Sequence, residues 1–422
     1  MHFPFKINLL LIIAFSIMIV SCNSKSDNPL NDILSEKDTI IKKVVDQTEK
    51  YEVQIIYTQI DRDSANVPQF IDFNYRLNSS VYFYPASTVK MPIAFLALEK
   101  LNEIKEQGYN INKYTTLEID SVRAFQSSVK KDSTSETGYA NVANYIKKIF
   151  LVSDNDAYNR LFEFLGRDYI NKKFKEKGIT PGRITHRLSS FDANNKYSNP
   201  ITFYDDSILY QQEEIVSQTE YLPLEPKNTL KGKGYIDKNN ELVNKKMDFS
   251  QKNYLPLKTL HQIIQRVIFP EKFSENKRFN LFEDDYEFLY KYMGMLPGES
   301  DFPKYDTTEY YDSYVKRIIF GDQKEPMPKH IRILNKTGSA YGYLIECAYV
   351  VDFENKIEFF LSTVIHVNEN SIYNDDQYEY DQIGVPFMAE LGRKIYQHEL
   401  KRKKKLVPDL SRFEPLFDYG NP

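Results

Sequence analysis

Residues 85–101 read PASTVKMPIAFLALEKL, and this stretch decides the fold. From Met91 to Leu101 it is apolar on nearly every side, which is typical of a helix buried in a protein core. Ser87 and Lys90 stand three residues apart at its beginning, so their side chains point to the same side of the helix, one turn apart. The sequence therefore predicts a buried helix with a hydroxyl and an amine at its N-terminal end.

This pair has the chemistry of an activated nucleophile. A helix N-terminus presents unpaired backbone N–H groups and a partial positive charge. That field, together with burial, lowers the pKa of a lysine, so Lys90 can accept the proton of the Ser87 hydroxyl. The structural alternative is that Ser87 caps the helix and Lys90 extends its amine to solvent. Two further S-x-x-K matches lie within residues 126–131, a polar stretch without such burial.

A second motif, Ser153-Asp154-Asn155, falls where one helical pattern ends and the next begins. Ser153 can relay a proton to a leaving nitrogen, and the Asn155 amide can hold a substrate carbonyl. Asp154 is better placed to cap a helix and brace the loop. All three residue types cap helices well, which is the structural alternative, and residues 26–28 repeat the same three letters in a polar segment.

A third motif, Lys336-Thr337-Gly338-Ser339, follows a predicted strand over His330–Leu334. At a sheet edge, Lys336 and Thr337 can present donors to a substrate carboxylate. Gly338 allows close backbone approach, and the Ser339 N–H can hold an oxyanion together with the N–H of the nucleophile. The structural alternative is a strand that ends in a glycine turn.

In this order, the three motifs resemble those of the penicillin-recognising serine enzymes, the class A β-lactamases and DD-peptidases. The resemblance covers most of residues 40–400. It implies that Ser87 is the acylated nucleophile, that Lys90 is the base and that Ser153 is the proton relay. It implies substrate binding by Asn155, Lys336, Thr337, Gly338 and Ser339, with an oxyanion hole formed by the amides of Ser87 and Ser339.

One departure from the family pattern concerns removal of the acyl group. In class A β-lactamases an omega-loop Glu, preceded by an Arg-Leu pair, activates the hydrolytic water. Residues Arg187–Asp192 match that stretch without gaps but place Asp192 where Glu is expected, and Lys196 stands in place of an Asn. Asp is shorter by one methylene, about 1.5 Å, a serious loss for a positioned base. Asp192 is the base if the loop shifts; otherwise it is a turn residue in a polar loop.

The predicted fold class is α+β, an antiparallel sheet flanked by helices plus an all-helical lobe, because strand patterns occupy both ends of the chain and helical patterns lie between them. Strands are expected at Val53–Tyr57, Phe70–Tyr75, His330–Leu334, Tyr343–Asp352 and Lys356–His366. Helices are expected around Ile40–Val45, Met91–Leu101, Tyr139–Lys177, Pro256–Val267 and Gly384–Leu400. The resulting domain spans residues 38–400 with an insertion at about 205–250, and a basic, then irregular, tail covers 401–422.

The N-terminus predicts export. Lys6 precedes a short apolar run, Ile7–Val20, and a small residue stands before Cys22, as in a secretory signal over residues 1–21. The segment resembles a bacterial lipobox, which implies a lipid on Cys22, a polar tether over residues 22–37 and a position in the cell envelope at a bacterial membrane. A plain signal peptide with an incidental cysteine is the alternative.

Composition excludes several function classes. A formal net charge of −4 gives no electrostatic case for nucleic acid. The six histidines are scattered, without an HExxH or CxxC pattern, so neither metal nor cofactor is expected. Cys347 lies in an apolar run and is expected in the core. Three functions stay open: a β-lactamase-like hydrolase, a DD-peptidase or esterase/amidase with slow deacylation, and a non-catalytic lipoprotein that binds cell-wall peptide.

Overall fold

The computed structural model describes residues 28–124, 126–190 and 193–417 of the chain. Cys22, the predicted signal segment and Asp192 lie outside these residues. In the described ranges, no helix combines the length and the apolar character that spanning a bilayer requires.

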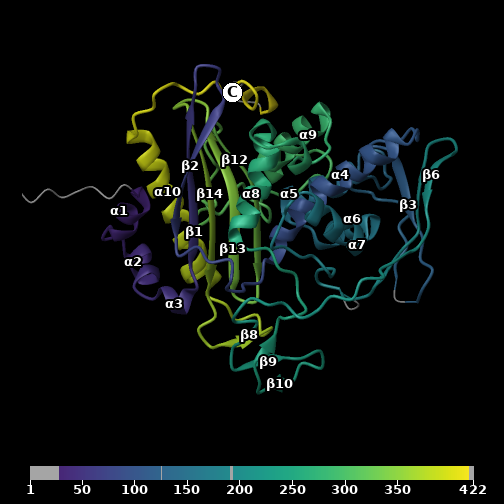
Figure 1. The fold of residues 1–422 in the computed structure, drawn as a ribbon, viewed down its shortest axis with the longest axis horizontal. Coiled ribbons are helices and arrows are strands. Elements are labelled where there is room, and N and C mark those ends of the chain that lie inside the picture. Colours follow the sequence, from purple (N-terminus) through teal and green to yellow (C-terminus); the bar gives the residue numbers. More distant parts are fainter. Residues whose placement is uncertain (1–27, 125, 191–192, 418–422) are drawn as a thin grey trace, which may run out of the picture.

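A five-stranded antiparallel sheet forms the centre of the molecule, in the order β12-β13-β14-β1-β2 (Figure 1). Its strands are β1 (Gln54–Arg62), β2 (Pro68–Tyr75), β12 (Ile331–Ala340), β13 (Tyr343–Asp352) and β14 (Ile357–His366). β1 pairs with β14 in a register that places Ile55 opposite Thr363. The first and last segments of the chain therefore share one sheet, which confirms the α+β prediction.

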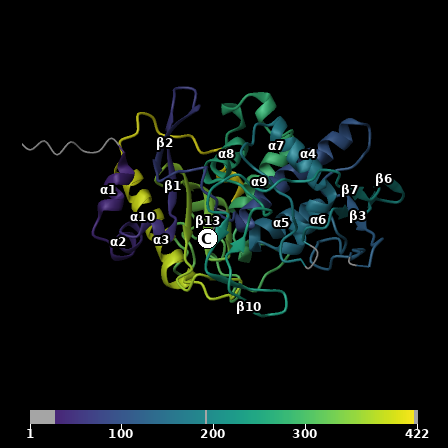
Figure 2. The ribbon, with the colours of Figure 1, turned by 60° about the horizontal axis from the view of Figure 1, so that its bottom comes forward.

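Helices cover both faces of the sheet, as Figures 1 and 2 show from two directions. One face carries α1 (Pro29–Ser35), α2 (Thr39–Val45), α3 (Thr48–Tyr51) and α10 (Val385–Lys401). The other carries α8 (Leu257–Ile268) and a lobe that contains α4 (Lys90–Glu106), α5 (Val142–Val152), α6 (Asn155–Leu165), α7 (Arg167–Glu176) and α9 (Glu283–Gly294). Residues 29–35 were expected to belong to the polar tether; they form α1 instead, because Leu30 is fully buried in the core.

Strand β13 shows why both faces need cover. All ten of its residues are buried, and alternate side chains enter different cores. Tyr343, Ile345 and Cys347 join the core on the side of α4 and α8. Leu344 and Ala348 join the core on the side of α10. This period-two division is that of a central strand between two layers, and it places Cys347 in the core, as expected.

The predicted buried helix is α4. Thirteen of its 17 residues are buried, including Lys90 at its first position. A short 3₁₀ helix, Ala86–Val89, leads directly into it, so the Ser87 and Lys90 segment forms one continuous helical entry. α4 packs against α5 and α6, which anchors this entry at the centre of the lobe.

The strand prediction at residues 330–334 was too short. β12 continues to Ala340, and Lys336 lies opposite Cys347 in the paired strand. The motif is therefore part of the strand and does not follow it. The polar residues and Gly338 favour a turn locally, but β12 pairs with buried β13 along its full length, and this pairing satisfies the backbone hydrogen bonds.

The insertion at about 205–250 consists of short strands. They are β6 (Ile208–Gln212), β7 (Ile215–Val216), β8 (Leu230–Lys231), β9 (Gly234–Ile236), β10 (Leu242–Val243) and β11 (Met247–Asp248). β6 extends a small sheet of β3 (Thr116–Ile119) and β5 (Ile201–Tyr204), so the lobe, expected to be all helical, also carries strands. β9 pairs with β15 (Ile372–Tyr373), a strand from the last part of the chain.

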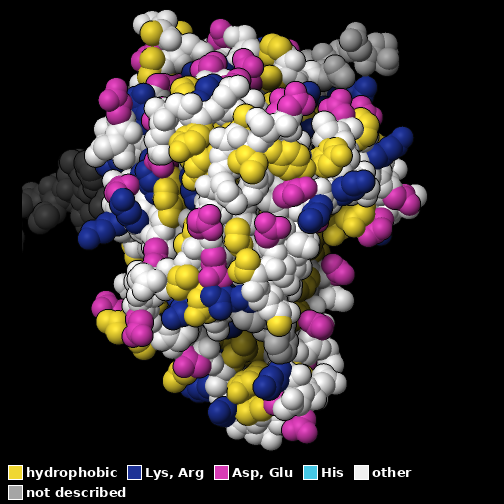
Figure 3. Space-filling model, turned by 90° about the vertical axis from the view of Figure 1, so that its right-hand side faces the viewer, with side chains coloured by type: hydrophobic (Ala, Val, Ile, Leu, Met, Phe, Trp, Pro, Cys, Tyr) yellow, Lys and Arg dark blue, Asp and Glu magenta, His cyan; other side chains and the backbone are white. Residues whose placement is uncertain are grey.

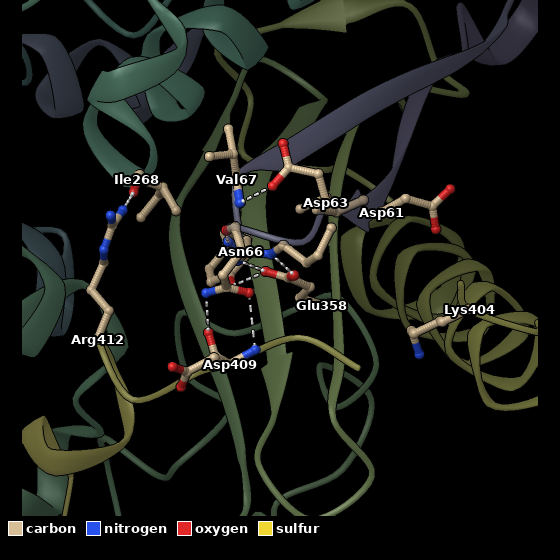
Figure 4. A network of polar contacts seen from close by, with 12 residues as sticks. Asp61, Asp63, Asn66, Val67, Ile268, Glu358, Lys404, Asp409 and Arg412 are labelled. Carbon is tan, nitrogen blue, oxygen red and sulfur yellow. Dashed lines mark hydrogen bonds and ion pairs between the residues drawn. The ribbon is translucent and has the colours of Figure 1, made fainter. Parts of the chain in front are cut away.

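The C-terminal tail folds back onto the hairpin between β1 and β2 (Figure 4). The Asn66 amide donates to the carbonyl of Asp409 at 3.0 Å, and the Asp409 N–H donates to the Asn66 side chain at 3.1 Å. Beneath them, Arg62 and Glu358 form a buried two-point ion pair. The tail thus packs against the turn that joins β1 and β2.

The outer face of the lobe shows Lys and Arg side chains interspersed with Asp and Glu (Figure 3). No broad field of one sign covers this face.

Candidate active site

Ser87 lies at a sharp turn between an extended segment and α4. Ala86, directly before it, has a φ of 47°, a left-handed conformation that is uncommon for a residue with a Cβ. The Thr88 N–H and hydroxyl both donate to the carbonyl of Pro85, which holds the turn. Strain of this kind persists only where the surroundings enforce it, and here it sets Ser87 at the boundary of two cavities.

Lys90 is fully buried and its amine has three partners. It donates to the carbonyl of Ser153, to the Asn155 side-chain oxygen at 2.7 Å and to the Ser153 hydroxyl at 3.3 Å. Burial lowers the pKa of Lys90 to about 7, and the nearby Asp154 carboxylate opposes this only in part. A large fraction of this amine is therefore neutral near pH 7 and can accept a proton.

Ser153 occupies the junction between α5 and α6. Its φ of 60° ends α5, and Asp154 then caps α6 by accepting from the Ala157 N–H at 2.8 Å. This is the capping role expected for Asp154. The turn directs the Ser153 hydroxyl toward Lys336, whose amine donates to it at 2.8 Å.

Two amines thus meet at one hydroxyl. The pKa of Lys336 lies well below its ordinary value, because the amine is buried and because Lys90 and Arg317 add positive charge nearby. Because both amines contact the same hydroxyl, the charge of one disfavours protonation of the other, so Lys90 and Lys336 are not readily protonated together. A substrate carboxylate in the cleft would favour the charged form of Lys336.

Gly338 permits the contact between β12 and the Ser87 turn. A Cβ at this position would lie 2.7 Å from the Ser87 nitrogen and 2.9 Å from the Thr88 nitrogen. These are backbone atoms and cannot rotate away, so only glycine fits. The close approach brings the backbone of β12 beside the amide of Ser87, as the predicted oxyanion hole requires.

Two cavities flank Ser87, with volumes of about 430 and 370 Å³. Both are lined by Ser87, Asn155, Ser339 and Tyr380. Thr337 and Gly338 line the second cavity only. The structure therefore brings residues of all three sequence motifs to one cleft, although nearly 250 residues separate the first motif from the third.

The cleft also contains residues that no motif indicated. Arg317 lines the second cavity, and its guanidinium lies 3.5 Å from the Ser339 hydroxyl oxygen. The Arg317 backbone N–H donates to Glu346, a buried carboxylate whose pKa burial raises to about 7. The available signal was a basic pair, Lys316 and Arg317, set among apolar residues, which is unusual unless the charges are paired or functional.

The loop after α7 contributes Ser189 to the first cavity. The Ser189 hydroxyl accepts from the Asn155 amide at 3.0 Å. Arg187 anchors the loop through a buried ion pair with Glu163 at 3.0 Å and through bonds to the carbonyls of Asn195 and Tyr197. Asp192, the predicted base, lies outside the described residues, so its position relative to the cleft stays a sequence prediction.

No group of three metal-ligating side chains comes together within residues 28–124, 126–190 and 193–417. The described cleft offers hydroxyls, amines, a guanidinium, amides, backbone N–H groups and the carboxylates of Asp376 and Asp381.

Residues 37–220 match a model described as the Beta-lactamase enzyme family. That segment is similar to this family. The beta-lactamase-like segment contains Ser87, Lys90, Ser153 and Asn155, whereas Lys336 lies beyond it and reaches the cleft through the sheet. No curated protein sequence matches the chain.

Solved structures that are similar include two beta-lactamases and a protein titled PBP-A. The beta-lactamase from Sphaerobacter thermophilus is 12% identical with a TM-score of 0.45, over 86% of this chain and 95% of that one. The beta-lactamase from Desulfarculus baarsii is 12% identical with a TM-score of 0.46, over 87% and 97%. PBP-A is 14% identical with a TM-score of 0.49, over 88% and 97%.

Proposed function

We propose that the chain is a serine hydrolase that forms an acyl-enzyme at Ser87 with a β-lactam or a related peptide amide. One observation carries the proposal: a buried amine of lowered pKa, Lys90, lies one helical turn from Ser87 and contacts the Ser153 hydroxyl. A second buried amine, Lys336, reaches the same hydroxyl from the opposite wall of the cleft. The family match over residues 37–220 supports a hydrolase of this type.

Acylation then proceeds by two proton transfers. The neutral amine of Lys90 takes the Ser87 proton as Oγ attacks the substrate carbonyl carbon, and the backbone amides of Ser87 and Ser339 hold the resulting oxyanion. Ser153 gives its proton to the leaving nitrogen as the C–N bond breaks, and a neighbouring ammonium group returns a proton to Ser153. The product is an ester at Ser87, which water hydrolyses to free the acid.

The cationic end of the cleft provides the recognition. The proposed partners of a substrate carboxylate are Lys336, Thr337 and Arg317, which lie on one side of Ser87. A carboxylate among these donors receives charge-assisted hydrogen bonds. It also offsets the mutual repulsion of the two amines at Ser153, so substrate binding and proton transfer are linked.

The rate of deacylation decides between two activities. The described residues of the 187–195 loop that line the cleft are Leu188 and Ser189, and neither has a carboxylate to act as a base. This observation favours, as the second candidate, a DD-peptidase or amidase that hydrolyses β-lactam adducts slowly. A fast β-lactamase requires Asp192 to reach the ester, and in that case Asp192→Asn traps the adduct.

The proposed setting is the cell envelope. The lipobox-like sequence ending at Cys22 is the basis of this proposal. Because α1 begins at Pro29 and packs into the core, a lipid on Cys22 would hold the domain close to the membrane surface. Mass analysis of the chain from a bacterial membrane fraction tests it: a diacylglyceryl group on the sulfur of an N-terminal Cys22 supports the anchor, and an unmodified Cys22 side chain excludes it.

The test of the function is covalent capture. The purified chain is incubated with benzylpenicillin, and intact-mass spectrometry with peptide mapping locates the adduct. We expect one added penicilloyl group, on the peptide that contains Ser87. An adduct on Ser127 or Ser128, the exposed serines of the other S-x-x-K matches, contradicts the assignment. Absence of any adduct, with retained binding of cell-wall peptide, identifies the chain as a non-catalytic binder.

The persistence of that adduct separates the two activities. After removal of free penicillin, an adduct that remains for hours indicates the slow enzyme. Loss within seconds, with continuous turnover of a chromogenic cephalosporin, indicates a β-lactamase.

Acylation is expected to accelerate as pH rises through about 7. The base form of Lys90 is the neutral amine, and its pKa is lowered to about 7 by burial. Raising the pH from 6 to 8 therefore raises the neutral fraction from about 0.09 to about 0.91, roughly a tenfold gain. Second-order acylation rate constants for benzylpenicillin at constant ionic strength measure this profile. A flat profile between pH 6 and 9 would rule Lys90 out as the base.

A further inference from the structure

The first cavity has a lining that the proposed chemistry at Ser87 does not use. Its walls carry four tyrosines, at positions 84, 341, 378 and 380. Among the described residues that line it, Asp376 bears the single ionisable carboxylate, and no Lys or Arg is present. The cavity is therefore aromatic and anionic.

The second cavity, on the other side of Ser87, has the opposite character. Arg317 lines it, and the amine of Lys336 lies at its inner wall against Ser153 and Thr337. Asp381 is present there as well, within the field of Arg317. The cleft is thus polarised along its length, with Asp376 at one end and the cationic donors at the other.

This polarity orients a substrate. The carboxylate of a β-lactam or of a C-terminal peptide lies on the leaving-group side of the scissile amide, so it occupies the cationic second cavity. The acyl side chain then extends into the first cavity. Tyrosine faces attract cations, and a carboxylate attracts an ammonium group while repelling another carboxylate.

The loop that carries Asp376 is held by contacts to distant parts of the chain. β15 pairs with β9 of the insertion, and the Asn374 amide donates to the carbonyl of Ile236 at 3.0 Å. A Cβ on Gly232 would lie 2.6 Å from the Ser371 carbonyl, so the insertion backbone fits tightly against this loop.

The tyrosines of this loop are held as well. The Tyr378 hydroxyl accepts from the Asn374 N–H at 2.7 Å, and the Tyr380 hydroxyl accepts from the Gly342 N–H at 2.9 Å. Through the pairing of β9 with β15 and the bond from Asn374 to Ile236, residues 205–250 support the loop that forms this wall of the cleft.

We propose that this aromatic and anionic cavity is an acyl-side subsite that selects substrates with a protonated amine, and that Asp376 is the residue that determines this specificity. The inference rests on the proposed acylation of Ser87 and adds the chemical class of the acyl side chain. A protonated amine on the carbon next to the side-chain carbonyl is expected to accelerate acylation. An uncharged side chain is expected to leave the rate unchanged, and a carboxylate is expected to slow acylation.

Three penicillins that differ at one carbon test the proposal. Ampicillin carries an α-amino group there, benzylpenicillin a hydrogen and carbenicillin a carboxylate. Second-order acylation rate constants are measured for the full chain at slightly acidic pH and low salt, where the α-amino group is protonated. We expect each step in the series ampicillin, benzylpenicillin, carbenicillin to slow acylation about five-fold, the effect of one solvated charge contact, and high salt to compress the series.

Two variants assign the effect. Asp376→Asn, which retains shape and loses charge, is expected to bring the three rates within about two-fold of one another, since no charge contact remains. Asp381→Asn, the matched change in the second cavity, is expected to preserve the order. Equal rates in the unmodified chain, or loss of the order in Asp381→Asn alone, overturns the subsite. Failure of all three penicillins to acylate the chain refutes the proposed function itself and is distinguishable from these results.

Discussion

Replacement of Ser87 by alanine is expected to abolish covalent labelling by benzylpenicillin, with a rate constant at least about 10³-fold lower. The hydroxyl is the only part of the proposed machinery that bonds to substrate carbon, and the residues one turn after Lys90 on α4, Ile93 and Ala94, carry no hydroxyl. The change removes one oxygen at a position already held in place by the Pro85 and Thr88 turn, so the fold is expected to survive. Intact-mass kinetics over hours measure the residual rate.

The matched control is Ser128→Ala, in an exposed S-x-x-K match. Its acylation rate is expected to equal that of the unmodified chain. A Ser87→Ala chain that still acquires one penicilloyl group at an unchanged rate would remove the nucleophile assignment and, with it, the proposed mechanism.

Substitution of Gly338 by alanine has the second largest expected effect, a loss of acylation of at least about 100-fold. The new methyl group would lie 2.7 Å from the Ser87 nitrogen and 2.9 Å from the Thr88 nitrogen. Either β12 or the Ser87 turn must move, and the backbone amides then no longer converge on the oxyanion, a loss of about 10²–10³ when one donor is removed in other enzymes. Overpacking of this kind also lowers the free energy of unfolding by about 1–3 kcal/mol.

Stability and geometry are separated by a second glycine variant. Gly138 has a φ of 77° and open space around its hydrogen, so Gly138→Ala strains the backbone without touching the cleft. It is expected to lower the melting temperature while acylation continues at the normal rate. If Gly338→Ala acylates as fast as Gly138→Ala, the close approach of β12 has no role in catalysis.

The parts of the fold that local sequence determines could be predicted. Met91–Leu101 is apolar all round, and a segment with no polar face must be buried wherever it lies. The three motifs were also recognisable, because each has its own residues in one short stretch. Their convergence on one cleft required the sheet, since β12 reaches the Ser87 turn only through its pairing with β13.

What could not be predicted depends on contacts between distant segments. Arg317 belongs to an irregular stretch without a motif, and its place in the cleft follows from the bond between its backbone and Glu346 on β13. Asp376 reaches the first cavity because β15 pairs with β9, a partner some 140 residues earlier in the chain. The extent of β12 was misjudged because glycine and polar residues favour a turn locally, whereas strand pairing overrides that preference.

The pairing of β1 with β14 has a consequence for biosynthesis. A nascent polypeptide displays Ser87 and Lys90 long before residues 331–366 leave the ribosome, and β1 has no partner on its β14 side until then. Premature termination or proteolytic trimming before residue 331 therefore yields a product that contains Ser87 but lacks β12 and the part of the cleft that β12 lines. If Ser87 is acylated as proposed, reactivity toward penicillin depends on synthesis of residues 331–366 and so reports on assembly of the complete sheet.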